Sequence, residues 1–570
     1  MAAATATPAN DLKSALAYKP QPLKFGTSGR RGEVIHLTQL EVYTNVVAEI
    51  RYLKSLPLAE GGIETGDEFF YAYDRRPSSI QLDENGRGGL SQAVEQALRD
   101  TGMVPVSLGP IPTPALTCWA LHKGKGSIMV TGSHIPFDRN GYKLNTSKGE
   151  LMKKDEQPIN DQVARFREEI LSKPFAESIF DEQGVLRKKE PLLSIIGDGR
   201  GAYIQRYLDF FKGETLEGMN LLAYQHSAVG RVLLVEIFEA LGAKVTPVGR
   251  SDTFVPIDTE AIDQAQLDTL QDLWSKSGQQ KIDAIISTDG DSDRPLILAP
   301  EGDKLRFFGG DILGMIVAEF LNIDSAVVPI SSNDAIDRGP LAAVTEPKTK
   351  IGSPYVISGM QRAISKGRSR VCGWEANGGF LTGCDLERNG NVLTALPTRD
   401  AFLPLLCALF AAKNRKITLP ELFDTLPRRF SRASLLRKFP RATALKIIQK
   451  FSPSDPNIQD ITYASDGVSA RDFEQATLEV KDPEKFQQIR SGLQTVLSTE
   501  FGFTEITRII YTDGVRILFS NGDVAHVRPS GNADELRIYS VADTQERADF
   551  IASQGVAEPD GFLRRLERMV

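Results

Sequence analysis

The sequence predicts a multi-domain α/β protein that ends in an α+β region, and three observations support this prediction. The chain has 570 residues, more than a single hydrophobic core usually holds, so we expect about three to five domains. Short apolar runs alternate with helix-like segments over most of the chain, as in α/β layers. Near the C-terminus, Asp513-Gly514 and Asn521-Gly522 flank the apolar run 515–519, which indicates antiparallel hairpins.

The elements expected in the α/β part repeat a strand, loop and helix order without visible sequence repetition. A second unit is expected to open near residues 192–196, and the first twenty or so residues are predicted to form a loosely ordered tail. In chain order, the expected elements are strands at 69–73, 104–108 and 127–130 with a helix around 92–98, then strands at 221–224, 244–248 and 282–286 with a helix around 234–241, then a helix at 312–321 with strands at 326–330 and 369–372.

The bulk composition is that of a soluble globular protein, with 41% apolar and 25% charged residues. A net charge of −7 provides no basic surface for nucleic acid or for an anionic membrane, so we expect neither partner. The sequence contains no apolar run long enough for a transmembrane helix and no secretory or mitochondrial leader pattern. Four cysteines without a CxxC pair predict free thiols in a reducing compartment, and hence a cytoplasmic protein.

A serine and a histidine follow the predicted strand 127–130 directly. Ser133 and His134 lie in the loop after this strand, and Lys143 comes ten residues after the serine. A nucleophile, a possible base and a cation are the groups that covalent group transfer needs. Ser-His pairs in loops often only cap turns, so the loop by itself leaves both interpretations open.

Three aspartates at alternate positions follow the apolar run 282–286. Asp289, Asp291 and Asp293 can turn their oxygens toward one cation, because alternate side chains of an extended loop share a side. Oxygen ligands suit magnesium, manganese or calcium rather than zinc. An EF-hand would need glycine and glutamate where Arg294 and Pro300 stand. A solvated acidic turn is disfavoured because a buried strand precedes the loop, so we predict a metal site.

The segment Arg528-Pro529-Ser530-Gly531-Asn532, with Arg537 after it, has the composition of an anion site. Guanidinium groups bind phosphate through two parallel hydrogen bonds, and glycine opens the backbone to a ligand. An ordinary Pro-Ser-Gly turn is the alternative. These residues alone do not separate the two.

A fourth loop, from Gly373 to Gly379, follows another predicted strand. Its Glu375 and Asn377 offer a carboxylate and an amide, which suit neutral hydroxyl groups. By itself this loop is ambiguous between contact with a sugar and simple turn chemistry.

Taken in this order, the four loops resemble those of the α-D-phosphohexomutase superfamily, which includes phosphomannomutases and phosphoglucomutases. The resemblance covers most of the chain. Residues 25–32 are similar to the opening motif of the family, and residues 74–79 and 112–114 are similar to its first-domain signatures. Residues 528–533 and 375–377 are most similar to the phosphomannomutase-type branches.

The resemblance implies three related α/β domains, at 1–190, 191–303 and 304–425, followed by a smaller α+β domain at 426–570, with one loop of each around a central cleft. It implies an isomerase of carbohydrate metabolism that interconverts hexose 1-phosphate and hexose 6-phosphate, through a phosphoserine and a hexose 1,6-bisphosphate that also serves as activator. Phosphomannomutase is the leading expectation, and a phosphoglucomutase or a dual-specificity enzyme is the alternative. A non-catalytic sugar-phosphate-binding paralogue and a phosphatase are the alternatives from other classes, and the resemblance leaves monomer and homodimer open.

The resemblance also implies a role for each candidate residue. Ser133 would carry the phosphoryl group and share one Mg²⁺ with Asp289, Asp291 and Asp293. The remaining roles would be catalytic support by Arg30, Lys143 and His134, sugar binding by Gly373, Glu375 and Asn377, and phosphate binding by Arg528, Ser530, Gly531, Asn532 and Arg537. Arg294, the last residue of the acidic loop, is a further candidate site residue without an assigned role.

The third region departs from the family pattern at several positions. Many relatives have histidine where Gly379 stands and serine where Asn377 stands. Several relatives place histidine or lysine around Ser353 and Pro354. Gly379 cannot transfer a proton, so the identity of the general base and the preferred hexose stay open.

Overall fold

The computed structural model describes residues 11–26, 29–260, 262–465, 467–530 and 534–570. The chain divides into two compact units, Met1–Phe307 with Gly379–Phe410 and Phe308–Gly378 with Ala411–Val570. The predicted α/β class is confirmed, whereas the bounds of the four predicted domains stay a prediction. No helix in the described part of the chain is both long and apolar enough to cross a membrane.

The first sheet has seven strands in the order β1-β2-β6-β5-β3-β4, with β7 paired to β6. β3 pairs in parallel with β4 and β5. β5, β6 and β2 form antiparallel pairs. The three strands expected here are confirmed. The bounds are β1 (Lys24–Phe25), β2 (Arg30–Glu33), β3 (Glu68–Tyr73), β4 (Val104–Gly109), β5 (Ser127–Val130), β6 (Arg139–Thr146) and β7 (Gly149–Glu150).

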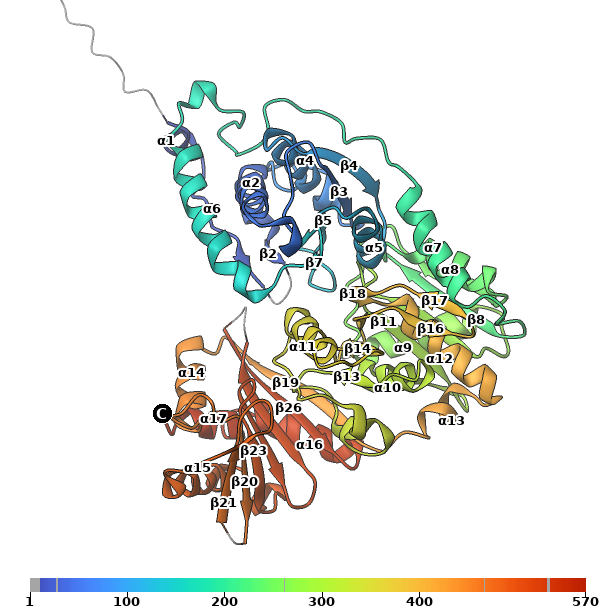
Figure 1. Cartoon of the computed structure of the whole chain (residues 1–570), viewed down its shortest axis with the longest axis vertical. Coiled ribbons are helices and arrows are strands. Elements are labelled where there is room, and N and C mark those ends of the chain that lie inside the picture. The colour runs from blue at the N-terminus through green and yellow to red at the C-terminus, as the bar shows by residue number, and fades with distance from the viewer. Residues whose placement is uncertain (1–10, 27–28, 261, 466, 531–533) are drawn as a thin grey trace, which may run out of the picture. The chain divides into compact units, whose positions relative to one another are not determined.

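Helices cover both faces of this sheet (Figure 1). Along β3, Phe69, Tyr71 and Tyr73 lie in a core with residues of α2, α4 and α6. Phe70 points to the other face, where its ring centroid lies 6.5 Å from that of Trp119 in α5. This alternation is the two-residue period of a strand. The helices are α2 (Gln39–Ser55), α3 (Pro77–Ile80), α4 (Leu90–Asp100), α5 (Thr113–Lys123) and α6 (Glu156–Leu171).

The prediction of a loosely ordered tail over the first twenty residues is wrong from Asp11 onward. Asp11 accepts a hydrogen bond from the Ser14 N–H and caps the short helix α1 (Leu12–Ala15). Leu12 is fully buried in the core that α2 and α6 share. Burial of this leucine attaches the segment to the first sheet.

The second sheet of the first unit has the order β12-β11-β10-β8-β9. β8 pairs in parallel with β9 and β10, and β11 pairs antiparallel with β10 and β12. The strand expected at 282–286 lies two residues later, so Asp289 follows β10 directly. Residues 192–196 form neither helix nor strand. The bounds are α7 (Asp198–Phe210), β8 (Asn220–His226), α8 (Arg231–Ala240), β9 (Lys244–Arg250), α9 (Gln264–Lys276), β10 (Ala284–Thr288), β11 (Pro295–Glu301) and β12 (Lys304–Phe307).

The rest of the first unit consists of two antiparallel strand pairs. β15 (Phe380–Thr382) pairs with β18 (Leu396–Asp400), and β16 (Leu386–Arg388) pairs with β17 (Asn391–Leu393). α12 (Phe402–Arg415) follows β18 and contains residues of both units.

The second unit contains a parallel strand pair and a large antiparallel sheet. The parallel pair is β13 (Ser325–Val327) and β14 (Val371–Trp374). The expected helix at 312–321 is α10 (Gly310–Phe320), and α11 (Ser353–Ser365) precedes β14. α13 (Leu419–Phe423) follows α12.

The large sheet has eight strands in the order β19-β26-β25-β24-β23-β20-β21-β22, all in antiparallel pairs. The predicted strand 515–519 is β24, with Gly514 and Gly522 at positive φ in the turns on either side. Helices α14 to α17 share one core with this sheet, which confirms the expected α+β unit. The bounds are β19 (Phe430–Arg437), α14 (Arg441–Lys450), β20 (Asp460–Ala464), β21 (Gly467–Arg471), β22 (Thr477–Leu478), α15 (Pro483–Val496), β23 (Ile506–Ile510), β24 (Val515–Phe519), β25 (Val524–Pro529), β26 (Glu535–Ala542), α16 (Gln545–Val556) and α17 (Phe562–Glu567).

Candidate active site

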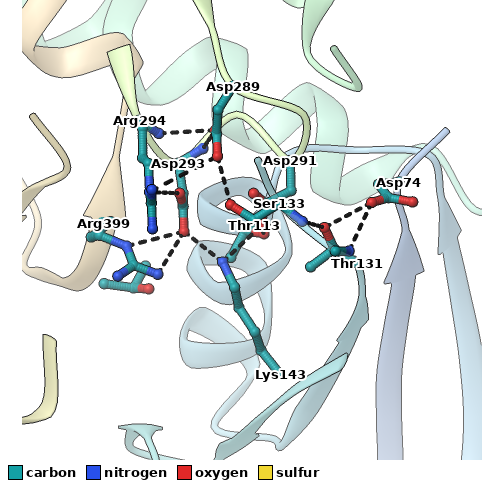
Figure 2. Close-up of polar contacts among 12 residues, drawn as sticks. Asp74, Thr113, Thr131, Ser133, Lys143, Asp289, Asp291, Asp293, Arg294 and Arg399 are labelled. Atoms are coloured by element: carbon teal, nitrogen blue, oxygen red, sulfur yellow. Dashed lines mark hydrogen bonds and ion pairs between the residues drawn. The ribbon is translucent and has the colours of Figure 1, made fainter. Parts of the chain in front are cut away.

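Two loops of the first unit meet at Ser133. One loop follows β5 and the other follows β10 (Figure 2). A Cβ atom on Gly290 would lie 2.6 Å from the Ser133 carbonyl oxygen. Glycine at this position therefore allows the serine and the aspartates to approach each other, although 156 residues separate Ser133 from Asp289.

Ser133 is held in a conformation that non-glycine residues rarely adopt, with a φ of 53°. Its N–H donates to Thr131 Oγ1 over 2.7 Å. The Thr131 hydroxyl donates in turn to Asp74 Oδ2 over 2.8 Å, and the Gly132 N–H donates to the same oxygen over 3.1 Å. Backbone strain persists where the surroundings impose it, and here Asp74 imposes it on a candidate nucleophile.

Arg76 fastens the rest of the Ser133 loop. Its guanidinium donates to the carbonyl oxygens of Ser133, Pro136 and Arg139 over 3.1, 2.7 and 2.8 Å. The group also lies 3.7 Å from the centre of the Phe254 ring. The motif at 74–79 thus supports the serine loop, a role that its sequence did not reveal.

The three predicted metal ligands are buried and close together. Asp289, Asp291 and Asp293 each place a carboxylate oxygen within 4.8 Å of the others. Asp289 Oδ1 accepts hydrogen bonds from the N–H groups of Asp293 and Arg294, over 3.1 and 3.2 Å. Its Oδ2 accepts a 2.7 Å hydrogen bond from the Ser133 hydroxyl. One oxygen of Asp289 therefore fixes the loop and the other faces the serine.

Asp291 and Asp293 divide their oxygens in the same way. Asp291 Oδ2 accepts hydrogen bonds from the Thr113 hydroxyl and Lys143 Nζ over 2.5 and 2.7 Å. Asp293 Oδ2 accepts from Lys143 Nζ over 2.5 Å and from Arg399 Nε and Nη2 over 3.1 and 3.0 Å. Within the described ranges, the buried Oδ1 atoms of both aspartates have no hydrogen-bond partner. Buried polar atoms normally have one, so these oxygens fit the ligand set of a hard cation.

The charges of the triad point to the same conclusion. Burial raises the pKa of Asp289 well above its ordinary value, and the negative charges of Asp291 and Asp293 raise it further. Burial also acts to raise the pKa values of Asp291 and Asp293, but Lys143 beside the first and Arg399 beside the second lower them. Lys143, Arg399 and Arg294 thus offset only part of the repulsion among the three buried carboxylates. A divalent cation would relieve this repulsion.

His134 and Arg294 lie at the edge of the triad. His134 Nδ1 is 3.5 Å from Ser133 Oγ, at the limit of a hydrogen bond. Burial lowers the pKa of His134 well below its ordinary value, and the positive charge of Arg294 lowers it further. The imidazole is therefore neutral near pH 7. Arg294 Nε lies 3.7 Å from Asp293 Oδ1.

The prediction that Arg30 neutralises charge at this site is corrected by the structure. Its guanidinium forms a buried 2.6 Å ion pair with Glu49 and lies against the Phe25 ring. Arg31 lies on the other side of β2, because neighbouring residues of a strand point to opposite faces. Burial lowers the pKa of Arg31 to about 10. The negative charge of Asp291 is the largest effect that opposes this shift. Of these two neighbouring arginines, Arg31 is therefore the one whose charge interacts with the triad.

Two further residues of this site carry no predicted role. Thr113 belongs to the recognised motif at 112–114, so the sequence held a signal for it. Arg399 lies 106 residues beyond Asp293 and belongs to no motif that pointed to a site. Its contact with the triad depends on the tertiary fold.

The predicted sugar-binding residues belong to the second unit. Glu375 and Asn377 follow β14 directly and are 4% and 7% exposed. The predicted contact of Gly373 with the sugar stays a prediction; the residue lies inside β14, and a Cβ there would approach Val356 Cγ1 to 2.4 Å and the Val327 carbonyl oxygen to 2.8 Å. Gly373 thus serves packing.

The predicted phosphate site lies on β25 and β26. Arg528 and Arg537 are directly opposite each other in the strand register, an arrangement that is unfavourable for like charges unless anions lie nearby. Asp513 Oδ1 is 3.5 Å from Arg528 Nε, and Glu535 Oε2 is 2.9 Å from Arg537 Nη2. The Ser530 N–H donates to the Glu535 carbonyl oxygen over 2.9 Å. The predicted Gly531 and Asn532 lie outside the described residues.

Comparisons with known proteins find one family over most of the chain. Residues 22–169 match the family model of the phosphoglucomutase/phosphomannomutase α/β/α domain I, and residues 477–557 match that of its C-terminal domain. A phosphomannomutase of Sinorhizobium fredii is 35% identical and the alignment covers 94% of this chain and 98% of that protein. A phosphomannomutase of Salmonella muenchen is 36% identical, with coverage of 92% and 93%. The crystal structure of a putative phosphomannomutase from Thermus thermophilus has a TM-score of 0.60 at 19% identity, with coverage of 93% and 97%.

Proposed function

Because the chain belongs to the phosphoglucomutase/phosphomannomutase family, we propose that it is a phosphomannomutase, which interconverts mannose 1-phosphate and mannose 6-phosphate. The family assignment confirms the predicted class, a phosphohexomutase and hence an isomerase. Two relatives at 35% and 36% identity carry the name phosphomannomutase, and this supports mannose as the hexose.

One observation carries the proposed chemistry. The Ser133 hydroxyl lies 2.7 Å from Asp289 Oδ2, beside two buried carboxylates that each keep one oxygen without a hydrogen bond in the described structure. A serine in this position is placed to carry a phosphoryl group next to a bound cation. Mg²⁺ held by Asp289, Asp291, Asp293 and a phosphoryl oxygen on Ser133 would neutralise the charge on the phosphoryl group.

In the first step, the free hydroxyl of a bound hexose phosphate attacks the phosphorus atom on Ser133. A new P–O bond forms to the sugar while the P–Oγ bond breaks, and Ser133 Oγ keeps the bonding electrons. The hydroxyl proton leaves the sugar and is finally taken up by Ser133 Oγ. Lys143, which is paired with Asp291 and Asp293, and the neutral His134 next to Ser133 relay this proton or support its transfer. The product of this step is hexose 1,6-bisphosphate.

In the second step, the bisphosphate reorients within the site, so that its other phosphoryl group faces Ser133. This group is then transferred to Ser133 Oγ. Arg528, Arg537 and Ser530 hold the phosphate that is not being transferred, and the paired guanidinium groups match its charge. Glu375 and Asn377 bind the 3- and 4-hydroxyls. Because these hydroxyls lie roughly symmetrically between C1 and C6, the same contacts serve both orientations.

Turnover of three substrates tests the proposal. We expect the highest kcat/KM with mannose 1-phosphate, compared with glucose 1-phosphate and N-acetylglucosamine 1-phosphate, and no net release of inorganic phosphate. Ser133→Ala is the matched inactive control. A higher kcat/KM for the amino sugar would overturn mannose as the substrate, and phosphate release at the rate of turnover would indicate a phosphatase.

A further inference from the structure

Arg399 reaches the acidic loop from the end of β18. Its side chain is almost completely buried, with 4% exposed. Nε and Nη2 both donate to Asp293 Oδ2, over 3.1 and 3.0 Å (Figure 2). Two donors on one planar group fix the orientation of a carboxylate more firmly than one point charge does. The other oxygen of this carboxylate, Asp293 Oδ1, has no hydrogen bond among the described residues.

The path of Arg399 crosses Gly379. A Cβ atom at position 379 would lie 2.4 Å from Arg399 Cδ, 2.6 Å from Cγ and 2.9 Å from Cβ. These are the three nearest atoms, and each distance is shorter than carbon atoms tolerate. In the sequence, Gly379 stood out as a departure from many relatives. The structure explains it, because any side chain at 379 would occupy the space that the Arg399 stem fills.

The backbone beneath Arg399 is anchored by its neighbour. Asp400 accepts hydrogen bonds from the Tyr203 hydroxyl over 2.7 Å, from the Tyr207 hydroxyl, and from the Phe402 N–H over 2.9 Å. Both tyrosines lie on α7 and are fully buried. Since neighbouring residues of a strand point to opposite sides, the Asp400 anchor holds β18 so that Arg399 points toward Asp293.

We propose that Arg399 is a positioning residue that holds Asp293 in the geometry needed to ligate the cation, and that Gly379 is the residue that makes room for it. The inference deepens the proposed function and rests on it, because it takes Asp293 as a ligand of the cation. It adds a residue outside the four recognised loops to the machinery of the site. Partners that orient metal ligands typically contribute about 10- to 100-fold to metal affinity or activity.

The sign of the effect separates positioning from simple charge. A cation beside a metal site repels the metal, so removal of a mere charge would tighten Mg²⁺ binding. Removal of a positioning group would weaken it, because Asp293 would lose its fixed orientation. Arg399→Lys keeps the charge but loses the planar pair of donors that converge on Asp293 Oδ2. The lysine variant should therefore behave like Arg399→Ala rather than like the wild type.

Isothermal titration calorimetry of the unphosphorylated protein with Mg²⁺ alone tests the proposal. It measures Mg²⁺ affinity and needs no sugar and no turnover. We expect about 10- to 100-fold weaker binding for Arg399→Ala and Arg399→Lys. Arg388→Ala is the matched control, because Arg388 also forms a paired ion contact in the first unit, with Glu214, and it should bind Mg²⁺ like the wild type. Unchanged or tighter binding in both Arg399 variants would overturn the proposal.

Gly379→Ala provides a second test that leaves Arg399 in the chain. The added methyl group should displace Arg399 and weaken Mg²⁺ binding to a similar extent. Combined with Arg399→Ala, it should add little, because both changes remove one interaction. Fully additive losses would contradict the proposed link. If the Arg399 variants bound Mg²⁺ more weakly than the wild type, but the wild type did not turn over mannose phosphates, the result would count against the proposed function and leave the role of Arg399 standing.

Discussion

The serine site of the first unit and the arginine pair of the second differ in how completely their charges are paired. Around Ser133, the carboxylates of Asp289 and Asp291 are fully buried and their fixed oxygens are already bound by the protein. The Arg528 and Arg537 side chains are 13% and 37% exposed. The two residues lie opposite each other on the adjacent strands β25 and β26. A group that reacts needs neighbours in fixed positions. A group proposed to bind the phosphate of a sugar in two orientations needs a charge that is accessible to the ligand.

The first prediction sharpens this comparison within the first unit. It separates an arginine that stabilises the fold from an arginine that takes part in the reaction. Arg30→Ala leaves Glu49 buried without its partner, so we expect a loss of about 3–5 kcal/mol in the free energy of unfolding. Urea denaturation measures this loss, and the KM values of the folded variant should stay close to those of the wild type. Arg31→Ala should do the opposite, with lower kcat and little change in stability. Equal kinetic defects in both variants would restore Arg30 to the site.

The metal site is the next point at which the comparison can be broken. Asp291→Asn removes one charge from the triad but keeps the shape, so we expect kcat to fall by about 10²- to 10³-fold. Chelation with EDTA should abolish turnover of the wild type, and excess Mg²⁺ should restore it. Turnover that persists in excess EDTA would exclude the metal role. Circular dichroism of the variant checks that the fold is kept.

The arginine pair should give the smallest effect. Arg528→Ala breaks a charge-assisted hydrogen bond, which typically contributes about 1.5–3 kcal/mol, or about 10- to 150-fold in rate or affinity. Because one pair serves both orientations, forward and reverse reactions should suffer alike, and more hexose 1,6-bisphosphate should escape per turnover. Product analysis in both directions measures this. Unchanged kcat and KM for both hexose phosphates would place Arg528 outside the site.

Sequence reasoning located the groups whose signal is local. The alternation of Asp289, Asp291 and Asp293 after a buried strand indicated one shared cation site, and their oxygens do converge. The tight turn signals around 515–519 placed β24 residue for residue. The convergence of the three carboxylates and the strand 515–519 were predictable because strand period and turn chemistry act over a few residues; the bound metal stays a prediction.

The errors and omissions arose where tertiary structure decides. Arg30 and Arg31 are adjacent, so a one-residue difference in the strand decides which side chain enters the core. No local pattern showed that the missing side chain of Gly373 makes room for Val356 and Val327. Arg399 meets Asp293 across 106 residues, and no local pattern predicts such a contact.

The central claim is that Ser133 carries the phosphoryl group, and peptide mapping by mass spectrometry tests it most directly. The protein is incubated with hexose 1,6-bisphosphate and Mg²⁺, digested and compared with Ser133→Ala treated in the same way. We predict one added phosphate on the peptide that contains Ser133, no added phosphate in the variant, and loss of the phosphate when mannose 6-phosphate is supplied. Phosphate on a different residue, or Ser133→Ala protein that turns over at a near wild-type rate, would contradict the account.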